Sequence, residues 1–175
     1  MRYTQSIKSI YLLVIFMLGT CFFDDLYGQE IKTVNNLEAN SEIAYYDLEQ
    51  GKAVSDENGA WDISFYKTNI ALNPGTNGRG QVKAKVLQQA FDKTDKAQTK
   101  TGLQTDQGEQ LAIPAGSGNG WYEYNMADHT INPIKNHVIL VKTRSGKLYK
   151  LEILNYYSEK DYSPANYSFR YALLQ

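Results

Sequence analysis

Residues 137–157 read HVILVKTRSGKLYKLEILNYY, and this stretch decides the fold. The apolar run VILV leads into a glycine-containing turn at residues 144–147, after which apolar and polar side chains alternate. Alternation with a period of two beside a short turn is the pattern of a β-hairpin with one buried face. On the return strand, one face carries Tyr149, Leu151 and Ile153, and the opposite face carries Lys150 and Glu152.

Further strands are predicted on both sides of this hairpin. Residues 42–55 predict two short strands joined by a turn at Gly51, and residues 61–73 predict one half-buried strand. Frequent short strands without a βαβ rhythm indicate an all-β domain with few or no helices beyond the N-terminal segment. Residues 166–174 predict a closing strand, in which Tyr167, Phe169, Tyr171 and Leu173 alternate with Ser168 and Arg170.

Three segments between these strands are less regular. Residues 82–98 fit a helix by propensity and a strand by their alternation of apolar residues with lysines, so both interpretations stay open. Residues 93–110 are polar and predict a loop. The stretch PGTNGRG at residues 74–80 matches no phosphate-binding motif and predicts a turn built on glycines.

The composition is that of a globular protein and argues against one class of function. Of the 175 residues, 42% are hydrophobic and 21% charged, which suits one domain whose core needs no disulfides. The net charge of −1 argues against a nucleic-acid-binding protein, because such a protein needs a basic surface to meet phosphates. The 14 tyrosines suit half-exposed sheet faces, where the ring packs and the hydroxyl stays in water.

The first 20 residues predict a signal peptide. Arg2 and Lys8 precede the apolar run IYLLVIFMLG, which is too short for a comfortable membrane span. Two processing sites stay open. MLGTC is a lipobox that would lipidate Cys21, and the acidic pair after it resembles a surface-export tag; cleavage near Gly28 would instead release a secreted protein. Both place the protein outside the cytoplasm, and only the lipidated form would be attached to a membrane, through its lipid anchor.

The chain therefore divides into a signal peptide at residues 1–20, a polar lead-in or tether at residues 21–40 and a β domain at residues 41–175. Nothing in the β domain predicts catalysis. The only cysteine, Cys21, lies outside it, no G-x-S-x-G nucleophile motif is present, and no spacing selects a Ser–His–acid triad. We expect a protein that is not an enzyme.

Four side chains close together in the sequence are candidates for binding a ligand. Met126 and His129 carry a thioether and an imidazole, and both groups serve as axial ligands of haem iron. Tyr122 and Tyr124 stand two apart on a predicted strand, so they face the same way, opposite Trp121, and could lie along a flat apolar ligand.

Three other aromatic side chains are predicted to be structural. Trp61 and Trp121 are expected in the core or on a sheet face, because their area is costly to leave in water. His137 opens the apolar run VILV, so we expect a histidine satisfied by a hydrogen bond within a strand rather than a metal ligand.

Several segments, taken in order, resemble the HmuY family of Bacteroidetes: YYDLEQGKAV, WDISFYKTNIALNPGTNGRG, GWYEY, HVILVKTRSGKLYKLEILNYY and YSFRYALLQ. The resemblance covers about residues 43–175 and implies a β-rich, hand-like fold in a secreted protein or surface lipoprotein. In characterised members it implies capture of haem, a tetrapyrrole, and its transfer to a TonB-dependent outer-membrane receptor. The alternative is a surface adhesion or scaffold protein that keeps the fold and does not bind haem.

The resemblance also implies where the iron ligands lie. The family places two axial ligands, a His pair or a Met pair, on separate loops, and the later one follows the W-x-E-[FY] segment. Counted from Trp121, that position is Met126 rather than His129. The earlier loop corresponds to residues 91–116, which contain neither His nor Met. Three alternatives stay open: a site with one ligand, a site completed by His129, or no haem site.

Overall fold

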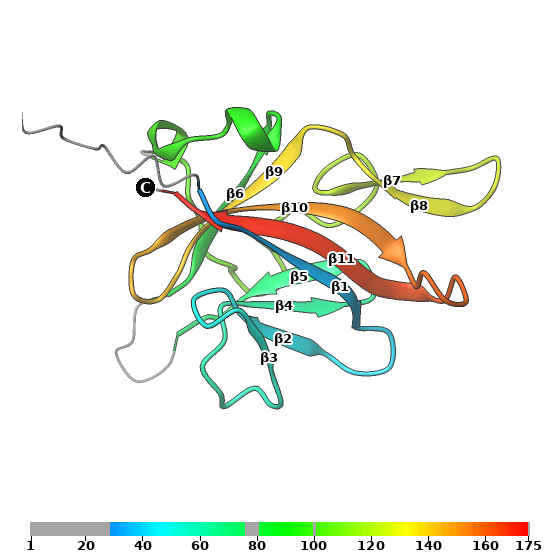
Figure 1. The fold of residues 1–175 in the computed structure, drawn as a ribbon, viewed down its shortest axis with the longest axis horizontal. Coiled ribbons are helices and arrows are strands. Elements are labelled where there is room, and N and C mark those ends of the chain that lie inside the picture. The colour runs from blue at the N-terminus through cyan, green and yellow to red at the C-terminus, as the bar shows by residue number, and fades with distance from the viewer. Residues whose placement is uncertain (1–28, 76–80, 100, 175) are drawn as a thin grey trace, which may run out of the picture.

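The computed structural model of the chain describes residues 29–75, 81–99 and 101–174 (Figure 1). The predicted signal peptide, Cys21, Gly28 and most of the PGTNGRG turn lie outside the described residues. None of the described helices is long and apolar enough to span a membrane. The all-β prediction is confirmed: the elements are β1 (Ile31–Glu38), β2 (Ala44–Asp47), β3 (Lys52–Val54), β4 (Ile63–Tyr66), β5 (Asn69–Leu72), β6 (Lys83–Gln88), the 3-10 helices η1 (Phe91–Lys93) and η2 (Lys96–Thr99), β7 (Tyr122–Asn125), β8 (Thr130–Pro133), β9 (His137–Lys142), β10 (Leu148–Tyr157) and β11 (Pro164–Leu173).

The larger sheet forms around the hairpin that the sequence predicts. β9 and β10 pair antiparallel across a turn in which Gly146 N donates to Thr143 O at 2.9 Å and Thr143 N donates to Lys147 O at 2.8 Å. Gly146 has a φ of 90°, a left-handed conformation that glycine adopts without strain. β11 pairs with β10 as the predicted closing strand, and the antiparallel strand order is β1-β11-β10-β9-β6.

The smaller sheet has the strand order β3-β2-β4-β5. Its first two strands confirm the predicted pair about Gly51. The prediction of one strand over residues 61–73 is wrong, because the chain reverses within this segment and forms the β4–β5 hairpin. Lys67 takes a φ of 52° in the turn between them. A reversal at a non-glycine residue in the left-handed region leaves no glycine or proline signal in the sequence.

The ambiguous segment at residues 82–98 is a strand followed by 3-10 turns. β6 pairs with β9 at the edge of the larger sheet, and η1 then passes over the outer face of that sheet. Lys150, predicted on an exposed face, is buried there and donates from Nζ to Phe91 O at 2.8 Å and to Thr94 O at 3.2 Å. The predicted exposure of Lys150 is wrong because the η1 segment covers the outer face of the larger sheet, which the sequence pattern did not indicate.

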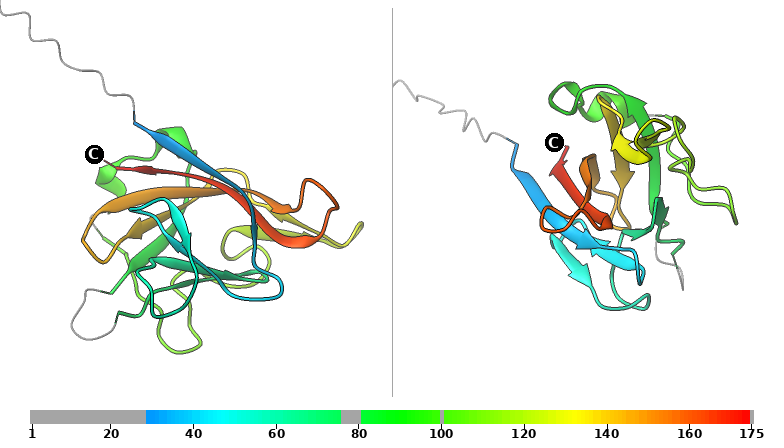
Figure 2. Two further views of the ribbon diagram at one scale, coloured as in Figure 1. Left: turned by 60° about the horizontal axis from the view of Figure 1, so that its bottom comes forward. Right: turned by 90° about the vertical axis from the view of Figure 1, so that its right-hand side faces the viewer.

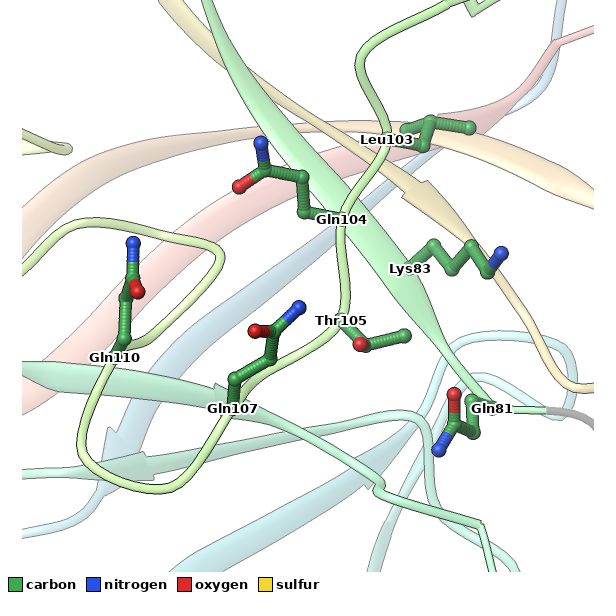
Figure 3. Close-up of a pocket in the computed structure, with 7 residues that line it drawn as sticks. All are labelled: Gln81, Lys83, Leu103, Gln104, Thr105, Gln107 and Gln110. Atoms are coloured by element: carbon green, nitrogen blue, oxygen red, sulfur yellow. The ribbon is translucent and has the colours of Figure 1, made fainter.

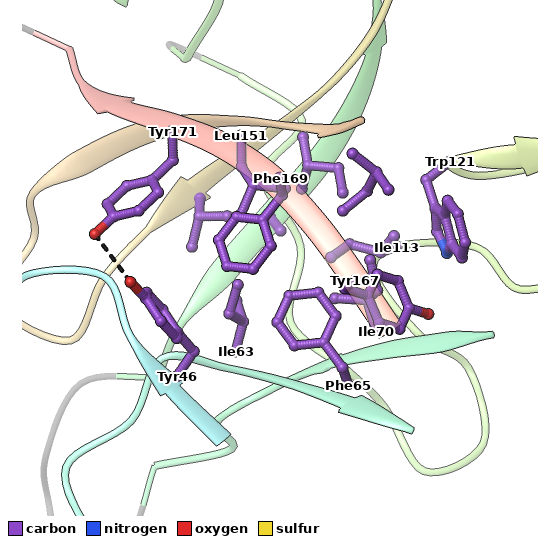
Figure 4. Packing of buried hydrophobic residues seen from close by; sticks show 14 of the residues in the cluster. Tyr46, Ile63, Phe65, Ile70, Ile113, Trp121, Leu151, Tyr167, Phe169 and Tyr171 are labelled. Atoms are coloured by element: carbon purple, nitrogen blue, oxygen red, sulfur yellow. Dashed lines mark hydrogen bonds between the residues drawn. The ribbon is translucent and has the colours of Figure 1, made fainter. Parts of the chain in front are cut away.

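The two sheets face each other across an aromatic core (Figures 2 and 4). From the larger sheet, the inward side of β11 supplies Tyr167, Phe169 and Tyr171, all buried. From the smaller sheet, the Phe65 ring stacks on Phe169 with centroids 5.3 Å apart, and Tyr46 shares a 3.3 Å hydroxyl hydrogen bond with Tyr171. These contacts join strands distant in sequence, and they place both tyrosines of β11 inside the protein rather than on a half-exposed face.

Part of the predicted lead-in at residues 21–40 belongs to the folded domain. Residues 31–38 form β1, which pairs antiparallel with β11 at the edge of the larger sheet. The register shifts between Val34 and Leu37, and Asn36 takes a φ of 54° in this bulge. Because the bulge breaks the period of two, the core-facing side chains are three residues apart and the sequence pattern does not indicate a strand.

Candidate functional site

The candidate ligands lie on the β7–β8 hairpin, which projects at the end of the domain opposite the start of β1 (Figure 1). The base of this hairpin is fixed in the core. The Trp121 ring is buried, and its Nε1 donates to Thr68 O at 3.0 Å. On the other strand, Ile131 N donates to the hydroxyl of Tyr157 at 2.8 Å. The hairpin is therefore held at its base by both sheets.

Tyr122 belongs to this fixed base. It exposes only 8% of its surface, and its ring lies 4.8 Å from that of Trp121 between centroids. Tyr122 therefore does not supply the exposed aromatic surface that we predicted, because the core reaches as far as the first residue of β7. Tyr124, two residues further out, exposes 39% of its surface and remains accessible to a ligand.

The tip of the hairpin is the four-residue turn 126–129, which is closed by the backbone pair of Asn125 and Thr130. Polar side chains stabilise it locally. Asn125 Oδ1 accepts a hydrogen bond from Ala127 N at 2.9 Å, and Asp128 Oδ1 accepts from the hydroxyl of Thr130 at 2.6 Å. That hydroxyl lowers the pKa of Asp128 below its usual value. The turn thus has a defined shape although it is fully in solvent.

Met126 is a highly exposed candidate ligand. It exposes 75% of its surface, whereas methionine is normally among the buried residue types. His129 is also exposed and takes a φ of 59°, so it stands in the left-handed region at the end of the turn. The thioether and the imidazole therefore lie at the two ends of one turn, both accessible.

Tyr124 and His129 form a pair that the sequence did not reveal. The Tyr124 hydroxyl lies 2.6 Å from His129 Nδ1, which leaves Nε2 of the same ring without a partner among the described residues. The contact needs the hairpin register together with the left-handed backbone of His129. Neither can be read from the spacing of the two residues.

His137 has the structural role that we predicted. Its Nδ1 lies 2.8 Å from Gly120 O, and since a carbonyl oxygen can only accept, the imidazole donates. This bond ties the start of β9 to the loop that enters β7. The bond holds the His137 ring at the base of the hairpin, which is the structural role of a histidine within a strand.

In the segment expected to carry the second iron ligand, residues 91–116, the described residues show no metal-binding cluster. Across the part of the chain that the structure describes, no group of three His, Cys, Asp or Glu side chains could hold a metal ion. This segment instead borders an open polar hollow of about 440 Å³ (Figure 3), lined by Gln81, Lys83, Leu103, Gln104, Thr105, Gln107 and Gln110.

These features define a small all-β domain with two facing sheets and a projecting, polar-tipped hairpin. The sequence profile described as HmuY protein matches residues 39–171, and the chain belongs to the HmuY family. The family predicted from the sequence segments is thereby confirmed. No curated protein sequence matches the chain.

Solved structures of similar fold include an apo HmuY analog, TFO, from Tannerella forsythia, with a TM-score of 0.53 and 15% identity over 85% of this chain and 96% of that one. Apo PinO from Porphyromonas gingivitis has a TM-score of 0.51 and 16% identity over 85% and 99%. A candidate lipoprotein from Bacteroides fragilis has a TM-score of 0.50 and 13% identity over 85% and 90%. At such identities the likeness shows the fold.

Proposed function

We propose that this protein binds haem or a related tetrapyrrole at the tip of β7–β8, with Met126 as the iron ligand. The observation that carries the proposal is the 75% exposure of Met126 on a hairpin whose base is fixed in the core. A thioether held in water is not packed in the core, so its sulfur is accessible to a ligand. Membership of the HmuY family and the position of Met126 after GWYEY support the same conclusion.

The donor set of the hairpin fits one axial position. Thioether sulfur and imidazole nitrogen are both established iron ligands in haem proteins. Met126 has a thioether sulfur, and its side chain is exposed rather than packed in the core. When bound, haem would supply an iron centre and a flat apolar ring. Tyr124, exposed to 39%, would contact that ring. His129 is the reserve ligand, because its Nδ1 contacts Tyr124 and its Nε2 has no hydrogen-bond partner among the described residues.

The proposal extends to the place where the protein acts. The signal-peptide pattern and the lipobox at Cys21 indicate an exported protein, secreted or anchored by lipid at the outer-membrane surface. Such a protein would capture haem and pass it to a TonB-dependent receptor. A hairpin that projects from the domain suits transfer, because a partner can reach its tip.

Titration of the protein with haemin, followed by absorbance, tests the binding. We expect a saturable Soret shift that weakens by about tenfold or more in Met126→Ala, because one bond to iron is lost. Ile31→Ala is the matched control, since Ile31 is an exposed apolar residue at the other end of the domain. Absence of any saturable shift would overturn the proposal. Loss in His129→Ala with no change in Met126→Ala would reassign the ligand.

A second function is favoured by one observation, the lack of His and Met in residues 91–116. A chain that keeps the fold without the second ligand could serve as a surface adhesion or scaffold protein that binds no haem. The two functions separate in the same titration, because the second predicts that wild type and Met126→Ala behave alike, with no saturable shift.

Lipidation of Cys21 makes a separate prediction. If the lipobox is used, membrane fractions contain the wild-type protein, while Cys21→Ser moves it to the soluble fraction or the medium, because a single acyl-bearing residue supplies the anchor. Fractionation followed by immunoblotting measures the shift. Membrane attachment that survives Cys21→Ser would favour a different means of attachment.

A further inference from the structure

We propose that the tip of β7–β8 is a binding site for a soft monovalent cation, Cu(I), held by Sδ of Met126 and Nε2 of His129. Thioether sulfur is a soft donor that selects Cu(I), and imidazole suits copper as well. Both donors are exposed on the same turn. This inference does not depend on haem binding, because it uses the two side chains together rather than Met126 on one face of a porphyrin.

The contact between Tyr124 and His129 prepares the imidazole for this role. Metal-bound histidines usually donate their other ring N–H to an oxygen, which fixes the tautomer and the ring orientation. The 2.6 Å contact between His129 Nδ1 and Tyr124 Oη supplies such an oxygen. When Nδ1–H donates to Tyr124, Nε2 carries the lone pair of the neutral imidazole, the pair that binds a metal ion.

The two donors stand at the two ends of one short turn. Met126 and His129 are the first and last residues of a turn closed by the Asn125–Thr130 pair. The hydrogen bonds of Asn125 and Asp128 hold the backbone of that turn in place. The methionine side chain has three rotatable bonds, so its sulfur can adjust to an ion that the better-ordered imidazole holds.

The surroundings favour a soft ion over a hard one. The nearest carboxylate in the turn, Asp128, already accepts hydrogen bonds from the Thr130 hydroxyl at 2.6 Å and from Thr130 N at 3.1 Å. Described residues offer no cluster of three His, Cys, Asp or Glu groups of the kind that Zn²⁺ uses. A site with one sulfur and one nitrogen suits Cu(I), which accepts few ligands, and suits Zn²⁺, Mg²⁺ and Ca²⁺ poorly.

Competition with a chromophoric Cu(I) chelator, under anaerobic conditions with ascorbate, measures this affinity. The test uses full-length protein in detergent with Cys21→Ser throughout, since the thiol would bind Cu(I) itself. We expect Met126→Leu and His129→Gln each to weaken the binding of one equivalent by about tenfold or more, and Tyr124→Phe by about tenfold. Met17→Leu, a methionine of the leader, is the matched control and should change nothing.

Two readouts decide the outcome. Equal Cu(I) affinity in the parent, Met126→Leu and His129→Gln would overturn the proposal. The role of Tyr124 is tested by the nitrogen NMR shifts of the His129 ring. We expect the tautomer protonated at Nδ1 in the parent protein and a mixture of both tautomers in Tyr124→Phe. If the tautomer is the same in both proteins, Tyr124 has no role in the site. A haemin titration of the same proteins keeps the two functions distinct, because loss of the Soret shift leaves the Cu(I) result standing.

Discussion

Asp62 is a buried carboxylate with few hydrogen bonds to offset its loss of hydration. It exposes 1% of its surface, and its Oδ2 accepts a hydrogen bond from Leu48 N at 3.0 Å. Among the described residues its Oδ1 has no hydrogen-bond partner, and Arg144 Nε lies 3.9 Å away. Burial raises the pKa of Asp62 to about 6; the carboxylates of Asp47 and Glu49 act in the same direction, and Arg144 opposes them. The contact between Asp62, beside the smaller sheet, and Arg144, in the β9–β10 turn, links these two parts of the domain.

The raised pKa of Asp62 predicts that stability falls as the pH rises from about 4 to about 6. The folded protein binds this proton more tightly than the unfolded chain does. The stability that the Asp62 carboxyl contributes is therefore fully present below its ordinary pKa, and it is lost as the pH rises past the pKa of Asp62 in the folded protein. The rise of the Asp62 pKa from 3.8 to about 6 corresponds to about 3 kcal/mol of folding free energy.

Glu49 titrates at lower pH than Asp62. Burial raises the pKa of Glu49, but hydrogen bonds from Ser145, Thr143 and Lys147 outweigh burial and lower this pKa to about 2.

Asp62→Asn should remove this pH dependence, because the amide does not titrate. Denaturant unfolding followed by tryptophan fluorescence between pH 4.5 and 7.5 measures the free energy of unfolding. We expect a falling curve in the wild type and a flatter one in Asp62→Asn. Glu42→Gln, at an exposed loop position, is the control and should keep the wild-type slope. A slope that is the same in Asp62→Asn and wild type would contradict the role of Asp62.

Single residues of the candidate site were only partly predictable. The sequence offered Met126 and His129 as candidates because their donor chemistry is local information, and the family resemblance placed Met126 at the position counted from Trp121; both stay predictions. It could not show that Tyr122 is covered, since burial at the base of a hairpin depends on strands that pack from elsewhere. Nor could it show the Tyr124–His129 bond, which requires the left-handed backbone of His129.

At the scale of elements, the β7–β8 hairpin depends on the close approach of the loop that enters it. A Cβ added at Gly120 would lie 2.1 Å from Pro114 O, a backbone atom that cannot move without the loop. The carbonyl of Gly120 also accepts the hydrogen bond from His137. Gly120 therefore fixes the loop, β7 and β9 relative to one another, and no side chain fits at this position.

Gly120→Ala should consequently destabilise the protein by about 1–3 kcal/mol, because overpacking against backbone shifts a whole loop. Gly118→Ala is the matched control in the same loop. A Cβ there meets nothing within 4 Å, but the φ of 79° costs a side chain about 1 kcal/mol. Thermal unfolding of the two variants checks the order. A loss in Gly120→Ala no greater than in Gly118→Ala would contradict the packing argument.

The elements that the sequence predicted correctly are those whose signals are local. The β9–β10 hairpin carries both a period of two and a glycine at its turn, and the structure confirms it. The β4–β5 hairpin turns at Lys67, where no turn residue marks the reversal. β6 was ambiguous because its lysines satisfy a helix and a strand equally, and pairing with β9 decides between them.

At the scale of the whole molecule, the larger sheet includes a strand that lies entirely before the matched family region. The HmuY profile begins at residue 39, yet β1 at residues 31–38 pairs along β11. Val34 and Leu37 pack against the main core, and β1 covers the backbone edge of β11. The polar composition of β1 and its bulge suit an edge strand, because both discourage pairing with another molecule.

Removing β1 should therefore lower the stability of the whole domain, which removal of an unstructured tether would not do. A chain starting at Ala39 loses the partly buried side chains of Val34 and Leu37 and leaves the edge of β11 unpaired, whereas a chain starting at Gln29 keeps them. We expect the shorter chain to lose about 2 kcal/mol, or roughly 4–8 °C in Tm, and to aggregate more readily through the open edge. Calorimetry and light scattering on the matched pair measure both effects. If the two chains unfold at the same temperature, β1 does not contribute to the cooperative unit, and the lead-in prediction for residues 21–40 regains its support.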